Sequence, residues 1–184
     1  MLSVYHVGGK TMSAGKTYKK TFDNKIDLSS KNLRIILDFY LFQCPVENKS
    51  KRGKTFEQLG WKGSNQFGVL KQKMLQNATS SLKSNYKPCK KDELEKAFLD
   101  VKKIRSPDEY CVFLKFDEKT VMQSLFSAIR NALAHGSFAV RTYDGKRIYF
   151  FSNYKEYLKA EIVLHEETLL NWIRIVKAGF NALD

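Results

Sequence analysis

The chain has 184 residues, a length typical of one domain with a buried core, and its content of 43% apolar and 13% aromatic residues excludes a disordered chain. The formal net charge of +13 indicates a polyanionic partner (RNA, DNA or an anionic membrane) or a role in solubility. No stretch approaches the roughly twenty apolar residues of a transmembrane helix, and the N-terminal apolar run is too short for a signal peptide, so we expect a cytoplasmic protein without membrane attachment.

The three cysteines, Cys44, Cys89 and Cys111, are odd in number, far apart and without CxxC spacing. A structural zinc site needs four close Cys or His ligands, and a secreted disulfide framework needs an even count. We therefore expect free thiols and no bound metal or other cofactor.

The first half of the chain indicates an arm followed by helices. Residues 1–28 are rich in Gly, Ser, Thr and Lys, and we expect a flexible N-terminal arm with a short strand at Leu2–Val7. Apolar residues at three- and four-residue spacing predict helices over 30–43, 64–82 and 92–104. Two basic loops are expected between them, at 49–54 and 83–91.

The second half carries the strongest signals. A continuous apolar face predicts a helix from about 117 to 134, which Gly136 ends. Two β-prone runs, 138–143 and 146–152, are joined by Asp144-Gly145, a strong hairpin signal. Residues 160–164 are a candidate third strand, and 166–182 are expected to form the last helix. The prediction is therefore a mainly α fold over 29–184, a bundle of about five helices with a small β-hairpin inserted before the last helix.

Phosphate chemistry is indicated at the end of the helix ending at 134, in the string Ile129-Arg130-Asn131-Ala132-Leu133-Ala134-His135-Gly136. Arginine presents a fork of donors that matches phosphate oxygens, and histidine can transfer a proton near neutral pH. At about 100° per residue, Asn131 lies nearly below His135, whereas Arg130 is about 140° away and must reach around the helix. The alternative is that Arg130 makes a surface salt bridge and His135 is an ordinary residue at a helix end.

The string R-N-A-L-A-H resembles the R-x(4–6)-H motif of the HEPN superfamily, in which a polar residue, often Asn, follows the Arg. The longer string IRNALAHGSF, followed by a hairpin and ETLLNWIRIVK, is similar to plasmid- and phage-associated HEPN proteins, most clearly over 117–180. This resemblance implies a HEPN-like helical bundle.

The resemblance also implies a metal-independent endoribonuclease that acts as a homodimer, often in toxin–antitoxin or anti-phage systems. His135 would transfer protons, Arg130 would clamp the phosphate, and Asn131 would be a positioning hydrogen-bond donor. Some HEPN toxins carry a Tyr two residues after the His, where a partner enzyme modifies it. Ser137 occupies that position, so this mode of neutralisation is not supported.

RNA contacts are predicted outside the motif at Arg141, Lys146 and Arg147 in the hairpin and at Lys51 and Arg52 in the first basic loop. A solvated hairpin face and an ordinary polar loop remain open as alternatives. The string from Gly8 to Thr17 resembles a P-loop, but the first motif position is Lys10 and Gly9 is one residue too early, which favours a flexible arm. The alternative function is a non-catalytic RNA-binding or assembly module of a defence system, with an antitoxin or a defence-system protein as partner.

Overall fold

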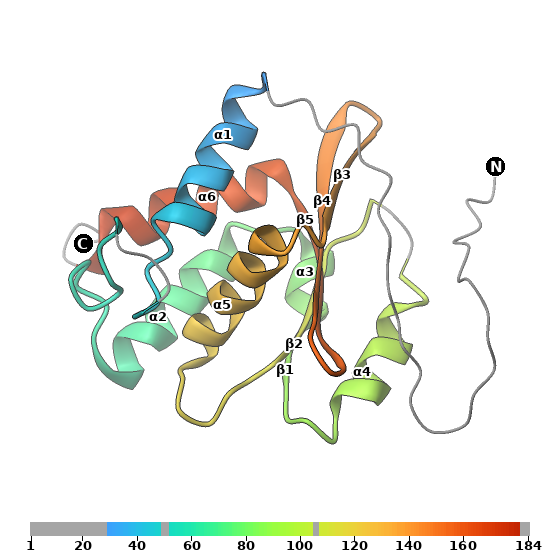
Figure 1. Cartoon of the computed structure of the whole chain (residues 1–184), viewed down its shortest axis with the longest axis horizontal. Coiled ribbons are helices and arrows are strands. Elements are labelled where there is room, and N and C mark those ends of the chain that lie inside the picture. The colour runs from blue at the N-terminus through green and yellow to red at the C-terminus, as the bar shows by residue number, and fades with distance from the viewer. Residues whose placement is uncertain (1–28, 49–51, 105–106, 181–184) are drawn as a thin grey trace.

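A computed structural model describes residues 29–48, 52–104 and 107–180 (Figure 1). The predicted arm at 1–28, its strand at Leu2–Val7 and the P-loop-like string lie outside the described residues. In chain order the elements are α1 (Lys31–Leu37), the π-helix η1 (Asp38–Phe42), α2 (Gly63–Gln76), α3 (Ser80–Ser84), β1 (Tyr86–Cys89), α4 (Leu94–Val101), β2 (Tyr110–Leu114), α5 (Val121–Ala134), β3 (Phe138–Tyr143), β4 (Lys146–Tyr154), β5 (Leu158–His165) and α6 (Glu166–Ala178).

The strands form one mixed sheet in the order β1-β2-β5-β4-β3. β1 is parallel to β2, and the other neighbours are antiparallel. β1 and β3 are therefore the two edges of the sheet.

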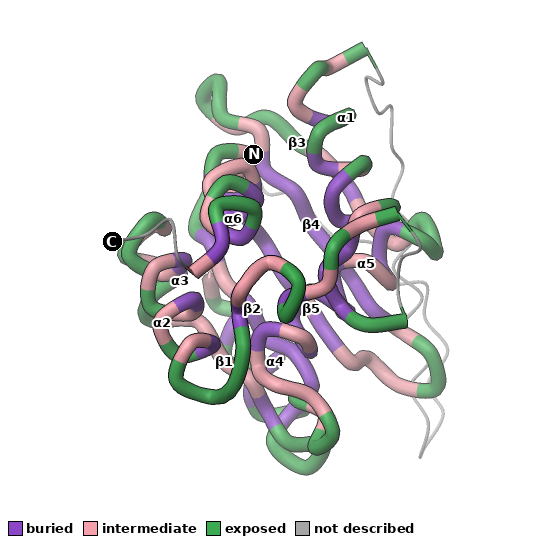
Figure 2. The backbone as a smooth tube through the Cα atoms, turned by 90° about the vertical axis from the view of Figure 1, so that its left-hand side faces the viewer, coloured by how far each residue is buried: buried purple, intermediate pink, exposed green. Residues whose placement is uncertain are grey.

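Helices cover both faces of the sheet, which has α1, α2, α5 and α6 on one side and α4 on the other (Figure 1). Successive side chains of each strand point to opposite faces of the sheet and pack against the helices on each side, as the two-residue period of a strand requires. Phe113, Phe151 and Ile162 belong to the large core with α1, α2, α5 and α6, whereas Val112 and Leu114 pack with α4. The central strands are accordingly buried along most of their length (Figure 2).

The predicted fold class is therefore wrong. The chain is not a mainly α, HEPN-like bundle with a small hairpin, because the hairpin is one side of a five-stranded sheet that helices cover on both faces. The candidate third strand at 160–164 is confirmed as part of β5 (Leu158–His165), and the sheet gains its remaining two strands, β1 and β2, from the segments between the predicted helices.

The sequences of β1 and β2 lack the alternation of apolar and polar residues that identifies a half-exposed strand. β2 reads YCVFL and is buried on both faces, so all of its positions are apolar or aromatic. β1 was predicted as a loop because it holds Pro88, yet proline is tolerated in an edge strand because it needs no amide donor on the open side. Only long-range pairing makes them recognisable: β1 pairs with β2, Tyr86 with Cys111 and Cys89 with Leu114, and β2 pairs with β5 on its other side.

The helix predictions are confirmed with shifted bounds. The helix expected over 64–82 is two helices, α2 and α3, separated at residues 77–79. The helix expected from 117 begins at Val121 and ends at Ala134. The Asp144-Gly145 hairpin is confirmed, since both residues have positive φ values of 48° and 75°, which a type I′ turn requires.

The cysteines agree with the sequence analysis, since Cys44, Cys89 and Cys111 are free and buried. Among the described residues no helix has the length and apolar composition needed to cross a membrane.

Candidate active site

α5 is a firmly anchored helix, and it carries the predicted site at its C-terminal end. Its start is a capping box: the Thr120 hydroxyl accepts from the Gln123 amide, and the Gln123 side chain accepts from the Thr120 amide at 2.8 Å. Its apolar face includes Leu125, Phe126 and Ile129, all fully buried against the sheet and η1. The capping box and the buried apolar face therefore hold the helix, including its C-terminal end, in a defined position.

Gly136 closes this end with a Schellman motif. The Gly136 amide donates to the Leu133 carbonyl at 3.2 Å, and the Ser137 amide donates to the Ala132 carbonyl at 2.8 Å. Gly136 has a φ of +64°, a left-handed conformation that favours glycine. The motif satisfies the last helix carbonyls and turns the chain directly into β3.

Arg130 lies one turn before the helix end, half-buried and without an acidic partner among the described residues. Its Nη1 donates to Oδ1 of Asn131 at 3.4 Å, and its Nε is buried with no hydrogen-bond partner. A guanidinium normally satisfies its donors with carboxylates, carbonyls or water. Because Nε is buried, an anion with several oxygens, such as a phosphate, could bind this arginine only through its Nη groups.

His135 is the residue that caps α5, and it is exposed. Its amide donates to the Asn131 carbonyl at 3.0 Å, so its backbone is fixed while its imidazole faces the surface. No hydrogen bond joins Arg130 to His135, in accord with their offset of about 140° around the helix. One chain therefore places one guanidinium and one imidazole at the same helix end.

The predicted RNA contacts in the hairpin do not gather around this helix end. Arg141 is directly opposite Ile148, and its guanidinium lies 5.7 Å from the ring centre of Phe150. Ile148 and Phe150 belong to the cluster on the sheet face away from α5, and Lys146 is two residues before Ile148. Arg141 and Lys146 are exposed, but they lie on the opposite face of the sheet from the Arg130 and His135 pair.

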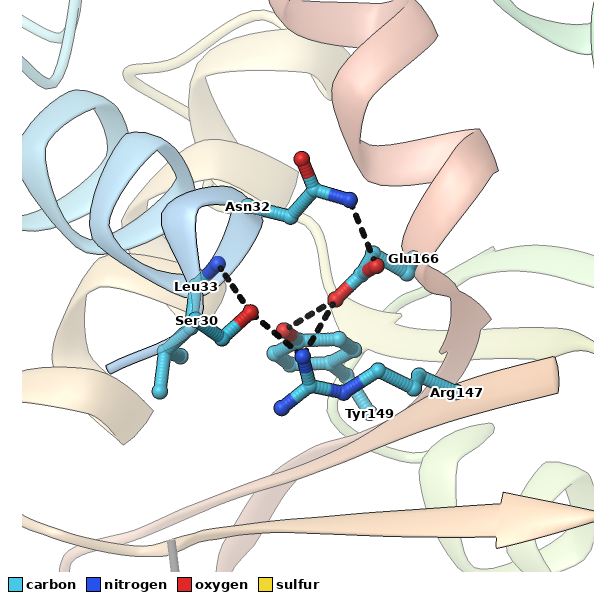
Figure 3. A network of polar contacts seen from close by, with 6 residues as sticks. All are labelled: Ser30, Asn32, Leu33, Arg147, Tyr149 and Glu166. Carbon is cyan, nitrogen blue, oxygen red and sulfur yellow. Dashed lines mark hydrogen bonds and ion pairs between the residues drawn. The ribbon is translucent and has the colours of Figure 1, made fainter. Parts of the chain in front are cut away.

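Arg147 lies on the same sheet face as α5, but it has intramolecular partners. Its Nη1 is 3.5 Å from Oε2 of Glu166 and donates to the Ser30 hydroxyl (Figure 3). These partners hold the guanidinium within the chain, and the contact of Arg147 with RNA stays a prediction. Of the two predicted residues in the first basic loop, Arg52 is exposed and Lys51 lies outside the described residues.

Glu166 joins three segments that are far apart in the sequence, and sequence analysis did not detect this cluster. Its carboxylate accepts from Nδ2 of Asn32 at 2.8 Å and from the Tyr149 hydroxyl at 2.9 Å, besides its ion pair with Arg147 (Figure 3). Burial, and next the hydrogen bond to the Glu166 carboxylate, raise the pKa of Tyr149 well above its usual value, so the hydroxyl remains a donor. The network ties the start of α1 and the start of α6 to β4.

Among the described residues no group of three or more His, Cys, Asp or Glu side chains could hold a metal ion. Comparison of the chain with protein-family models, with curated proteins and with solved structures gives no match.

Proposed function

We propose that this protein is a metal-independent endoribonuclease with Arg130 and His135 as its catalytic residues. The observation that carries the proposal is the half-buried Arg130, which has no acidic partner among the described residues and whose Nη1 donates to Oδ1 of Asn131 at 3.4 Å, on the same helix end as the exposed His135. The resemblance of R-N-A-L-A-H to the HEPN motif supports the same chemistry. Both arguments concern the site alone. Neither depends on the predicted helical bundle, which is wrong because the fold contains a mixed sheet.

The reaction would use the RNA's own 2′-hydroxyl as nucleophile. Its oxygen bonds to the adjacent phosphorus as the bond from phosphorus to the 5′-oxygen breaks, leaving a 2′,3′-cyclic phosphate and a free 5′-hydroxyl. Arg130 would donate to the phosphoryl oxygens, whose negative charge grows in the transition state. His135 would transfer a proton, and Asn131 would hold the Arg130 guanidinium in position.

The homodimer is part of the proposal, because proton counting requires a second group. One proton leaves the 2′-hydroxyl and one must reach the 5′-oxygen on the opposite side of the phosphorus, and one imidazole cannot easily serve both positions. A second copy of His135 across a two-fold axis would supply it. Such an enzyme would act as a toxin or an anti-phage effector, held in check by an antitoxin or another defence-system protein.

The test is cleavage of labelled single-stranded RNA by the purified protein in excess chelator. We expect 2′,3′-cyclic phosphate ends, and no cleavage of a matching strand with one 2′-deoxyribose at the cleaved position. Activity that disappears with the chelator and returns with magnesium would refute the mechanism.

The second candidate function is a non-catalytic RNA-binding module, favoured by the offset of Arg130 and His135 around the helix and the lack of a hydrogen bond between them. RNA that binds tightly and stays intact in the same assay would establish this alternative.

A further inference from the structure

The positive charge is concentrated in one part of the chain. Residues 58–91, which include α2, α3 and β1, contain seven lysines and no aspartate or glutamate. The Arg130 and His135 site uses none of these residues. A segment of one charge sign attracts polyanions over distances of about the Debye length, roughly 10 Å at moderate salt.

An open groove of about 570 Å³ lies between α2 and α3 within this segment. Its lining consists of two lysines, two glutamines, one leucine and one glycine: Lys71, Lys83, Gln72, Gln76, Leu75 and Gly68. No carboxylate lines it. A Cβ on Gly68 would meet no atom within 4 Å, so this side of the groove is free of side-chain bulk.

A buried carboxylate fixes the start of α3 against the segment before β2 and the start of α6. Glu109 is fully buried, and its Oε2 accepts from the hydroxyl of Thr79, the residue that caps α3, at 2.7 Å. Its Oε1 accepts from the His165 amide, at the start of α6, at 2.7 Å. Because α3 has only five residues, this hydrogen bond at its cap also restrains Lys83, which lines the groove.

The lysines of this segment differ in how far neighbouring groups neutralise their charge. The Lys87 ammonium forms an ion pair with Asp100 at 3.0 Å, so part of its charge is neutralised. The Lys71 ammonium instead lies 5.4 Å from the ring centre of Tyr86, which holds it near β1 without neutralising it. Lys71 and Lys83 therefore present net positive charge to the groove from two different helices.

We infer that this groove binds the backbone of single-stranded RNA, with Lys71 and Lys83 on phosphates and the amides of Gln72 and Gln76 on ribose hydroxyls or base edges. The inference rests on the proposed function, because it identifies the RNA as the strand to be cut. Lysines supply sequence-independent phosphate contacts, and side-chain amides can recognise the 2′-hydroxyl. The apolar floor at Leu75 accepts a base.

The groove lies far from the Arg130 and His135 pair. α3 leads into β1 and α5 leads into β3, and these are the opposite edges of the five-stranded sheet. Four strand spacings amount to roughly 19 Å. The groove would therefore hold the RNA several nucleotides away from the bond that is cut.

The test is the affinity of a fluorescent twelve-nucleotide 2′-O-methyl RNA, which lacks the nucleophile and so reports binding alone, measured by anisotropy at several salt concentrations. We expect Lys71→Ala/Lys83→Ala to weaken binding about tenfold at moderate salt and to reduce the slope of log Kd against log salt by about 1.4, as for two lost single-strand phosphate contacts. The matched control, Lys96→Ala/Lys103→Ala, removes the same charge from exposed positions on and after α4 and should change the affinity less than twofold.

Equal losses in the two double variants, or no loss in the groove variant, would overturn the inference. So would a loss seen with duplex DNA but not with the RNA. The single variant Lys83→Glu, at an exposed position, repeats the test with α2 unchanged in case the double variant folds poorly. Groove-dependent binding without cleavage of natural RNA would refute only the proposed catalysis, whereas cleavage with groove-independent binding would refute only this inference.

Discussion

Nη1 of Arg130 donates to Oδ1 of Asn131, the next residue of α5, at 3.4 Å, while Nε of the same guanidinium is buried and has no partner. A comparable pair exists on α6, where Nη1 of the exposed Arg174 donates to Oδ1 of Asn171 at 2.9 Å. The two pairs share their chemistry and differ in their neighbours, since only Arg130 has His135 on the same helix end. Arg174 is therefore the matched control for Arg130.

Arg130→Ala should reduce RNA cleavage about a hundredfold or more, because it removes the donors that stabilise the transition-state charge. The free energy of unfolding should change by no more than about 1 kcal/mol, since no ion pair is lost. Arg174→Ala should leave cleavage unchanged. The measurements are single-turnover cleavage and denaturant unfolding of both variants; an Arg130→Ala enzyme with normal activity would remove Arg130 from the mechanism.

If Asn131 positions the Arg130 guanidinium, as proposed, two substitutions of Asn131 should separate the effect of geometry from that of charge. Asn131→Ala should lower kcat with little change in KM, because the guanidinium loses its support. Asn131→Asp keeps the acceptor oxygen but pairs Arg130 with a carboxylate, which competes with phosphate and should raise KM. Identical changes in kcat and KM for the two variants would exclude this role.

The composite site can be tested by mixing subunits. If four-fifths of the subunits are His135→Ala, random pairing leaves about one dimer in twenty-five with two wild-type subunits. Activity should then fall toward that fraction, because mixed dimers hold one imidazole. Light scattering gives the mass in parallel. A decrease only in proportion to wild-type content, or an active monomer, would contradict a shared site.

Replacing two glycines by alanine should change the free energy of unfolding in opposite directions. Gly136→Ala should destabilise the fold by about 1 kcal/mol, because the φ of +64° strains a residue with a Cβ. Gly68→Ala, in the middle of α2 and with open space around the new Cβ, should stabilise it by about 0.5 to 1 kcal/mol. Denaturant unfolding measures both. A loss of stability in Gly68→Ala similar to that in Gly136→Ala would show that φ does not explain the difference.

Tyr149 predicts a pH dependence of stability at alkaline pH. Its pKa is raised in the folded protein by burial and by the Glu166 carboxylate, so above about pH 10 the unfolded chain releases a proton that the folded chain retains. Its contribution to stability is therefore complete below pH 10 and decreases as the pH rises further. Tyr149→Phe should reduce this decrease by roughly 1.4 kcal/mol per pH unit. An unchanged slope in unfolding experiments above pH 10 would contradict it.

Local chemistry determined much of this protein from the sequence alone. Three- and four-residue apolar spacing identified the helices, and Gly136 identified the end of α5, because a helix and its termination depend on residues a few positions apart. Asp144-Gly145 identified the hairpin for the same reason. The string from Arg130 to His135 placed the candidate site at a helix end, where the structure has it.

Only the tertiary structure decided how those elements combine. β1 and β2 become strands by pairing with each other, Tyr86 with Cys111, and β2 also by pairing with β5, Cys111 with Ile162, across separations that no local pattern spans. Arg147 was predicted to contact RNA, but Glu166 and Ser30 reach it from two other segments. Whether a strand has a partner, or an arginine a carboxylate, depends on groups brought together by folding, and that information is absent from any short stretch of sequence.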